Sequence, residues 1–473
     1  MLGLFGALDL GSRSLQVQQQ GVEVAGHNLA NVNNPAYARQ RLAIGAAPSI
    51  DTATGPQGTG VAVIGIERLR SSILDSQIQD EASVQGSLQA QQDALQYAEA
   101  NLGQQIDRSA SADPLTAAQG GQVGLAGSLT ALFSKFQSLS TDPSSMTERQ
   151  ALLSQASTLA TQFNQVDQRL GSLQGQLNGT LADDTGKAND LLQQIAALNT
   201  QITRSEQNSG GEANDLRDSR QDKLEQLAQL VKVDAVEGND GALNISIAGT
   251  SFVEGGKTVE TLEDYDGGGG QMMVRAQTSG LGLNLTGGSL HGTIEARDGA
   301  VADLRKGINT LASQLITEVN AAHRDGFSLT GTTGADFFTG TGAGDIQVNS
   351  ALKDNAALIQ AAGVSDAAGD GAVAKAMGQL ADKQISILGG STLSQNYAQT
   401  VTGFGQSQSA VDQQLTDQSA VTGMLSQQRE SVSGVSMDEE MTNLVKFQKA
   451  YAASAKLITT IDDMLNTVIN LKQ

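Results

Sequence analysis

Histidines are the side chains of this sequence best suited to carry chemistry. The three histidines, His27, His291 and His323, lie far apart, without cysteine partners and without the short spacing of a metal site. An imidazole can act as a metal ligand or a general base, so either role stays open as an alternative. Their positions favour helix ends and turns. We therefore predict no metal, no cofactor and no catalytic residue.

Two glycine-rich stretches are weak matches to ligand-binding loops. The segment DYDGGGGQ, residues 264–271, lacks the later acidic ligand of a calcium loop. The segment GTTGADFFTGTGAGD, residues 331–345, lacks the Gly-Lys-Ser/Thr of a phosphate-binding loop. Ser454 and Lys456 are two residues apart and do not share a helical face, which excludes a dyad. We interpret residues 264–271 as a hairpin loop and residues 331–345 as turns.

The composition favours a structural protein. The chain has 473 residues, 50 acidic and 29 basic, and a net charge of −21, which argues against nucleic-acid binding. It has no Cys and no Trp, so disulfides and thiolate metal sites are excluded. No apolar run approaches the roughly 20 residues of a membrane span. No cleavable signal peptide is recognisable, so we expect a cytosolic protein or export without leader cleavage.

An amphipathic helix is predicted over residues 4–32. Apolar residues recur at intervals of seven, which is typical of long packed helices. These residues are Leu8, Leu15, Val22 and Leu29. The helix should end at NVNNPAY, because Asn favours turns and proline disfavours helix in the residue before it. The residues expected to shape this turn are Asn28, Asn31, Asn33, Pro35 and Tyr37.

A second amphipathic helix fills the last 38 residues. Ser436 and Glu439 have the spacing of a capping box, which marks its start. One apolar seam consists of Leu444, Tyr451, Ile458 and Leu465, and a second of Phe447, Ile461 and Val468. We predict that this helix packs beside the first one. We also expect both to need further subunits for full burial, and to be poorly ordered in a lone chain.

The middle of the chain alternates helical and β-rich character. Residues 37–70 are predicted to be extended, and helices are predicted near 146–178, 185–207 and 213–231. Residues 350–430 should be mostly helical. The predicted divisions are an N-terminal assembly helix (1–36), an extended segment and long helical bundle (37–231), a β-rich outer domain (232–292), a helical return with Gly/Thr-rich turns (293–430) and a C-terminal assembly helix (431–473).

This pattern predicts a multi-domain, mainly α fold with a β-rich outer module. The N- and C-terminal helices should pair in a coiled-coil-like bundle beside a middle helical domain and a small antiparallel β domain.

Several segments resemble bacterial flagellar axial proteins. The run NLANVNNPAY, residues 28–37, resembles their Asn-Leu-Ala-Asn-x-Asn-Thr-x-Gly-Tyr motif. Asn34 and Ala36 replace the usual Thr and Gly, and a positive φ at position 36 would strain Ala. The continuation Ala38-Arg39-Gln40, the strand GVAVIGIERL, the segment EVNAAHRDGFSLTGTTGADFF and the C-terminal helix are similar to the hook-associated protein 1 family.

The resemblance implies a non-enzymatic structural subunit of the bacterial flagellum. It implies export through the flagellar type III system and assembly, outside the cell, of a ring at the hook–filament junction that filament assembly needs. The implied partners are further copies of the chain, the hook protein, the second hook–filament junction protein and a cytosolic export chaperone on the C-terminal helix. Nucleic acid and membrane are not among them.

Other functions stay open from the residues alone. The chain could be a hook, rod or second junction subunit, although its long α-rich middle favours neither hook nor rod. A secreted cell-wall hydrolase would need paired carboxylates in a cleft, and no separate lytic module is recognisable. A translocator acting on host membranes would need apolar hairpins of membrane length, which are absent.

Overall fold

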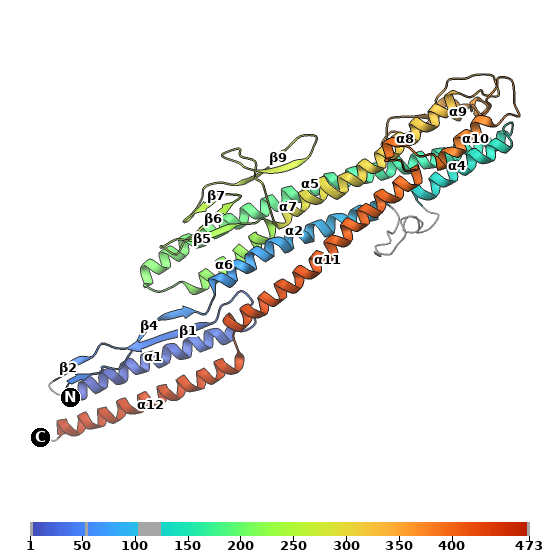
Figure 1. Ribbon diagram of the computed structural model, residues 1–473. Coiled ribbons are helices and arrows are strands. Elements are labelled where there is room, and N and C mark those ends of the chain that lie inside the picture. The colour runs from blue at the N-terminus through green and yellow to red at the C-terminus, as the bar shows by residue number, and fades with distance from the viewer. Residues whose placement is uncertain (1–2, 53–54, 103–123, 471–473) are drawn as a thin grey trace.

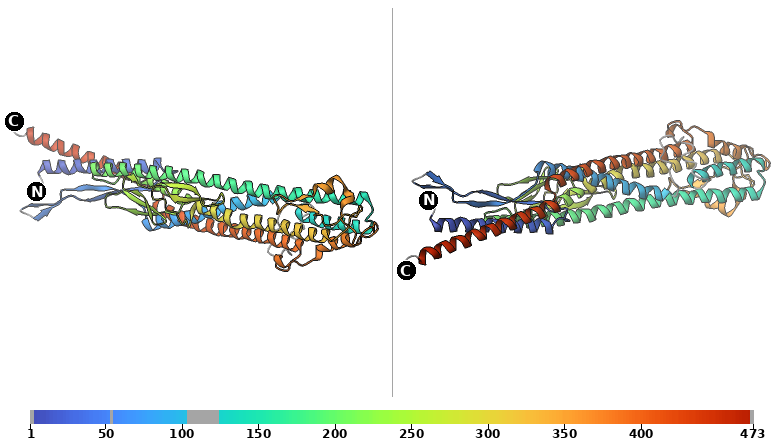
Figure 2. Two further views of the ribbon diagram at one scale, coloured as in Figure 1. Left: turned by 90° about the horizontal axis from the view of Figure 1, so that it is seen from above. Right: turned by 90° about the horizontal axis from the view of Figure 1, so that it is seen from below.

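The molecule is a long rod. The computed structural model describes residues 3–52, 55–102 and 124–470. The long helices run roughly along the rod, and both ends of the chain lie at the same end of it (Figure 1). Views from above and below show the same elongated outline (Figure 2). The fold is mainly helical with small antiparallel sheets, as predicted.

One end of the rod is formed by two helices and a β ribbon, which we call the terminal unit. Helix α1 (Leu4–Ala30) packs along α12 (Met437–Asn470). The ribbon pairs β1 (Gln40–Ala46) with β4 (Val61–Arg68), and β2 (Ile50–Thr52) pairs with β3 (Gly55–Gln57). Figure 1 shows the ribbon alongside α1, with α12 on the other side of that helix. The predicted extended segment 37–70 is confirmed as these strands.

The remaining helices form the shaft of the rod. Helix α5 runs for 64 residues along it, and the polar segment after α5 turns the chain into α6, as predicted. Among the described residues, the shaft begins with helices α2 (Ser72–Leu102), α4 (Leu125–Thr141), α5 (Met146–Ser209) and α6 (Asn214–Leu230). The returning helices are α7 (Gly288–Ala296), α8 (Ala302–Arg324) and α11 (Leu393–Ser433), and a π-helical turn (Arg297–Val301) joins the first two.

The β-rich module packs on α5. Its four-stranded antiparallel sheet has the order β5-β6-β7-β8, and a separate hairpin joins β9 to β10. The strands are β5 (Asp234–Glu237), β6 (Leu243–Ile247), β7 (Thr250–Glu254), β8 (Lys257–Thr258), β9 (Leu262–Asp266) and β10 (Met272–Ala276). All of them fall within the predicted β-rich range of 232–292.

Two apolar clusters hold the shaft together. One joins α2, α4, α5, α8, α10 (Ala372–Gln379) and α11 in the distal half of the rod. The other joins α5, α6 and α7 to the β module. Among the described residues, neither cluster includes a side chain of α1, α12, β1 or β4. The terminal unit is therefore attached to the shaft by other means.

One prediction about the helices was wrong. No break separates residues 178 and 185, because Leu177, Leu181 and Ala188 continue the buried stripe of α5 through the polar segment between them. Packing thus overrides the weak local helix propensity there. Residues 350–430 are mostly helical, as predicted, although the first part, residues 350–392, consists of short helices and turns. Asn349 and Asn355 each cap a short helix, and Gly389 and Gly390 have positive φ.

At the far tip, strands β11 (Phe338–Thr339) and β12 (Gln347–Val348) pair beside helix α9 (Ser350–Asp354). Among the described residues, no helix is both long and apolar enough to cross a bilayer.

Candidate functional site

Helices α1 and α12 pair in antiparallel register. Ser14 Oγ and Ser454 Oγ are 2.8 Å apart although 440 residues separate them in sequence. Asn28, near the end of α1, hydrogen-bonds Glu440, near the start of α12. The residue numbers of the two contacts have the same sum, as an antiparallel pair requires. The chain therefore folds back so that its first and last helices form one two-helix rod.

Two glycines let these helices approach closely. A Cβ added at Gly11 would lie 2.8 Å from Ile458 Cγ1, and one added at Gly21 would lie 2.6 Å from the Phe447 ring. Both distances are shorter than a van der Waals contact. The side chains of Ile458 and Phe447 thus fill space that any larger residue of α1 would occupy.

The predicted apolar stripes only partly coincide with the buried faces of the two helices. In α1 the buried residues are Gly11, Val17, Gly21, Val24, Ala25 and Asn28. The predicted Leu8, Leu15, Val22 and Leu29 are half-buried. In α12 Ile461 is buried and Leu444, Phe447, Ile458 and Leu465 are half-buried. Tyr451 and Val468 are 42% and 54% exposed.

The Asn28 side chain is the centre of the contact between the chain ends. Its Nδ2 donates to the Gln40 carbonyl oxygen (2.8 Å) and to Glu440 Oε2 (3.1 Å). Its Oδ1 accepts from the Tyr37 hydroxyl (2.7 Å) and from the Gln40 amide (2.9 Å). With 1% exposure and four bonds, the amide is fully satisfied. Asn28 joins α1, β1 and α12 through one side chain.

The turn after α1 is built by asparagine. Asn31 Nδ2 donates to the His27 carbonyl, and Asn34 Oδ1 accepts from the Ala36 amide at 3.2 Å, which is an Asx turn. Asn33 and Pro35 are exposed. Among the described residues, positive φ outside glycine occurs at Ala248 and Asp366. Position 36 thus has an ordinary backbone conformation, and alanine is unstrained there.

The start of α12 is tied to the same turn. Ser436 Oγ accepts from the Glu439 amide at 3.5 Å, which is one half of a capping box. The carboxylate of Glu439 binds Arg39 Nη1 at 2.7 Å. Glu440, whose side chain is 3% exposed, binds Arg39 Nη2 at 2.6 Å. Arg39 therefore joins the turn after α1 to the first turn of α12.

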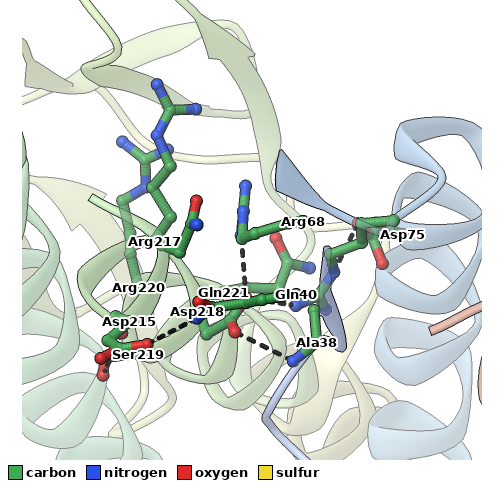
Figure 3. Close-up of polar contacts among 12 residues, drawn as sticks. Ala38, Gln40, Arg68, Asp75, Asp215, Arg217, Asp218, Ser219, Arg220 and Gln221 are labelled. Carbon is green, nitrogen blue, oxygen red and sulfur yellow. Dashed lines mark hydrogen bonds and ion pairs between the residues drawn. The ribbon is translucent and has the colours of Figure 1, made fainter. Parts of the chain in front are cut away.

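A second polar group connects the terminal unit to the shaft, and its centre is Asp218 of α6 (Figure 3). Its Oδ2 accepts from the Ala38 amide at 2.9 Å. Its Oδ1 accepts from Arg68 at 2.9 Å and from Arg70 at 3.2 Å. Next to it, Asp215 accepts from Gln40 Nε2 at 2.9 Å. We call the turn 31–39 and this group the polar joint.

The polar joint continues into the shaft through Arg70. Its guanidinium binds Asp75 at 2.8 Å and Glu225 at 3.5 Å, and Glu225 also binds Arg429 of α11 at 2.8 Å. Burial raises the pKa of Asp75, although Arg70 opposes the shift. Burial and the carboxylates of the joint also raise the pKa of Tyr37. These charges lie far apart in sequence and show no periodicity, so sequence reasoning missed the joint.

The three histidines are hydrogen-bonded to protein groups. His27 Nδ1 lies 3.0 Å from the Tyr37 hydroxyl, and His291 Nδ1 lies 3.1 Å from Ser87 Oγ. His323 is buried; its Nδ1 donates to the Ala335 carbonyl (2.7 Å), and its Nε2 accepts from the Gln360 amide (3.0 Å). This arrangement holds His323 in the neutral form.

The protein should lose stability as acid protonates His323. Burial lowers the pKa of His323 from 6.5 to about 4. The unfolded chain therefore binds the proton first, so the free energy of unfolding should fall by about 3 kcal/mol as the pH drops from about 6.5 to about 4. Urea titrations of the wild type and His323→Gln across this range measure the difference. If the free energies of unfolding of the wild type and of His323→Gln fall in parallel, the loss of stability in acid does not arise from His323.

The glycine-rich stretches are turns capped by aspartate. Asp266 Oδ1, in the β9–β10 hairpin, accepts from the Gly268 amide at 2.8 Å. Asp345 Oδ1 accepts from the amides of Thr341 and Gly342, both at 2.8 Å. The Asp345 pKa is lowered by these bonds. Both aspartates therefore order the backbone of their own loops.

The chain is similar to known proteins over nearly its whole length. Residues 115–338 match the model of the "Flagellar hook-associated protein FlgK helical domain". The chain is 26% identical to flagellar hook-associated protein 1 of Bacillus subtilis, and the alignment covers 99% of both chains. It is 24% identical to the protein of the same name from Escherichia coli, with 97% of this chain and 98% of the relative covered.

Over nearly its whole length the chain is therefore similar to flagellar hook-associated protein 1. These similarities support a structural component of the flagellum, because the relatives and the matching model bear the names of flagellar hook-associated proteins. The fold of the chain is shared with the solved flagellar hook junction protein FlgK from Burkholderia pseudomallei (TM-score 0.65, 16% identity), with 76% of this chain and 100% of that chain covered.

The last helix matches a second family model. Residues 426–471 match the C-terminal model of flagellar basal body rod proteins, so this segment is of a type shared by flagellar axial components. The match includes the end of α11 and the whole described length of α12.

Proposed function

We propose that this chain is a non-enzymatic subunit of the hook–filament junction. It leaves the cell through the flagellar type III system and assembles in a ring with copies of itself, outside the cell. The ring contacts the hook protein and the second hook–filament junction protein. Before export, a cytosolic chaperone covers α12. Whole-length similarity to hook-associated protein 1 relatives supports this role.

The observation that carries the proposal is the incomplete burial of α12. Leu457, Met464 and Val468, seven and four residues apart, are 44%, 52% and 54% exposed along one side of the helix. A single chain leaves this apolar stripe in water, at the end of the rod where both chain ends meet (Figure 2). We propose that neighbouring copies cover it, so that α1 and α12 form the inner layer of the ring.

Charges on this stripe should prevent assembly. Met464→Asp with Val468→Asp places two carboxylates where we propose a buried contact, which is costly without partners. We expect cells with this variant to secrete the protein but to lack attached filaments. Asn466→Asp adds a charge between the two positions, on the opposite side of the helix, and should leave filaments in place. Normal filaments in the double variant would contradict the proposed contact.

Another flagellar axial subunit is the alternative role, because the α12 segment matches the rod-protein model. Immunogold labelling separates the two roles. A single narrow band between hook and filament supports the junction, and label along the whole hook or rod supports the alternative.

A further inference from the structure

Polar groups form a set of contacts between the terminal unit and the shaft. Asp218 of α6 accepts from Ala38 and Arg68, Asp215 accepts from Gln40, and Asn214 Nδ2 donates to the Ile66 carbonyl at 3.0 Å. Neither apolar cluster of the described shaft extends into α1, α12, β1 or β4. Polar contacts are specific in direction but lack the contact area of an apolar core. Such a boundary can break and re-form without exposing a core.

Several buried polar atoms at this boundary have no hydrogen-bond partner among the described residues. They are Arg68 Nε, Asp75 Oδ1 and Asn214 Oδ1. A partly satisfied network is where alternative sets of hydrogen bonds are nearest in free energy. The charges at the joint therefore have spare bonding capacity for a second arrangement.

The turn 31–38 has space on two sides. A cavity of 420 Å³ lies between it and the end of α11, lined by Pro35, Arg429 and Gly434 among others. A cavity of 480 Å³ lies between the same turn and α6, where Asn34, Asp215 and Asp222 contribute. The turn is therefore not closely packed against either helix on these two sides. Within the described part of the chain, the backbone crosses the boundary at residues 69–71, between β4 and α2, and at residues 434–436, between α11 and α12.

We propose that the polar joint is an electrostatic hinge. The terminal unit turns as one body relative to the shaft, and the ion pairs of Asp218 and Glu225 hold one angle. Within the terminal unit, Asn28, Arg39 and the close packing at Gly11 and Gly21 keep α1 and α12 together. If α1 and α12 form the ring as proposed above, the hinge lets the shaft change angle while the ring contacts persist.

Distances between spin labels on the monomer test the hinge. The chain has no Cys, so an introduced pair of cysteines is labelled uniquely. Arg204→Cys on α5 and Gln448→Cys on α12 are exposed positions that span the joint. With Asp218→Asn we expect the distance distribution to shift or to broaden at least about twofold. About 1 M salt, where the Debye length is about 3 Å, should act in the same direction.

Two controls separate a hinge from unfolding. Gln20→Cys with Lys449→Cys lies wholly within the terminal unit, and its distance should stay unchanged in Asp218→Asn. Asp222 lines the cavity beside the turn but pairs with Lys223 and Gln226 of its own helix, so Asp222→Asn removes a charge without breaking an ion pair of the joint and should leave both distances unchanged. The proposal is overturned if the spanning distance stays narrow and unshifted in Asp218→Asn, or if the internal pair broadens equally. The monomer measurement does not depend on ring assembly, so it can fail independently of the proposed function.

Discussion

Asn28→Asp is expected to uncouple the two ends of the chain. The change replaces the Nδ2 donor with an oxygen, 3.1 Å from Glu440 Oε2 and 2.8 Å from the Gln40 carbonyl oxygen. Two buried carboxylates would then face each other. An uncompensated buried charge of this kind costs about 3–5 kcal/mol. Hydrogen–deuterium exchange of the full chain should show faster exchange over residues 24–44 and 437–445, and cells with the variant should swim poorly.

Asn33→Asp is the matched control, because the same chemical change occurs in the same turn at an exposed side chain. We expect Asn33→Asp to show the hydrogen–deuterium exchange rates and the swimming of the wild type. A lower pH should partly restore slow hydrogen–deuterium exchange in Asn28→Asp, since the introduced carboxyl can take up a proton next to Glu440. Equal exchange in both variants would show that Asn28 is not the centre of the contact.

Gly292→Ala is expected to destabilise the shaft severely. Gly292 of α7 lies against α2 so closely that an added Cβ would be 2.1 Å from the Ser87 carbonyl oxygen. The obstacle is backbone of a long helix, so the two helices must separate. Overpacking of this kind costs about 3 kcal/mol or more. Thermal unfolding followed by circular dichroism should show a clear drop in Tm.

Gly179→Ala in α5 is the control for this variant. Nothing lies within 4 Å of a Cβ added at Gly179. Alanine is favoured over glycine in a helix by about 1 kcal/mol, so this variant should gain stability. The opposite changes in Tm expected for Gly292→Ala and Gly179→Ala distinguish a packing effect from helix propensity. A Tm for Gly292→Ala at or above that of the wild type would show that α2 and α7 are not in close contact.

The sequence predicted the terminal helices well because their signals are local. The helix predicted over residues 4–32 is α1 (Leu4–Ala30), and Ser436 marks the start of α12 within one residue. The Ser436 hydroxyl reaches the Glu439 amide, but the Glu439 carboxylate binds Arg39 instead of returning to the cap. A partner 400 residues away cannot be read from a four-residue motif.

The packing of α1 could be predicted only in part. A pattern of large apolar residues points to leucines, whereas the closest contacts use Gly11 and Gly21, which carry no hydrophobic signal. The half-buried Leu8 and Leu15 lie beside that face. The polar joint could not be predicted from the sequence for a related reason. Arg70, Asp218 and Arg429 meet through the tertiary fold, and isolated charges in a sequence usually indicate a solvated surface.

The central claim is that the first and last helices of one chain pair in antiparallel register. Ser14→Cys with Ser454→Cys tests it directly, because the hydroxyl oxygens are 2.8 Å apart and the chain has no other Cys. Mild oxidation of the full chain should form an intramolecular disulfide that closes nearly the whole chain into a loop and changes its migration on a non-reducing gel. Ser14→Cys with Thr467→Cys, out of register on the far side of α12, should not close. Failure of the first pair to close, or equal closure of both pairs, would contradict the claim.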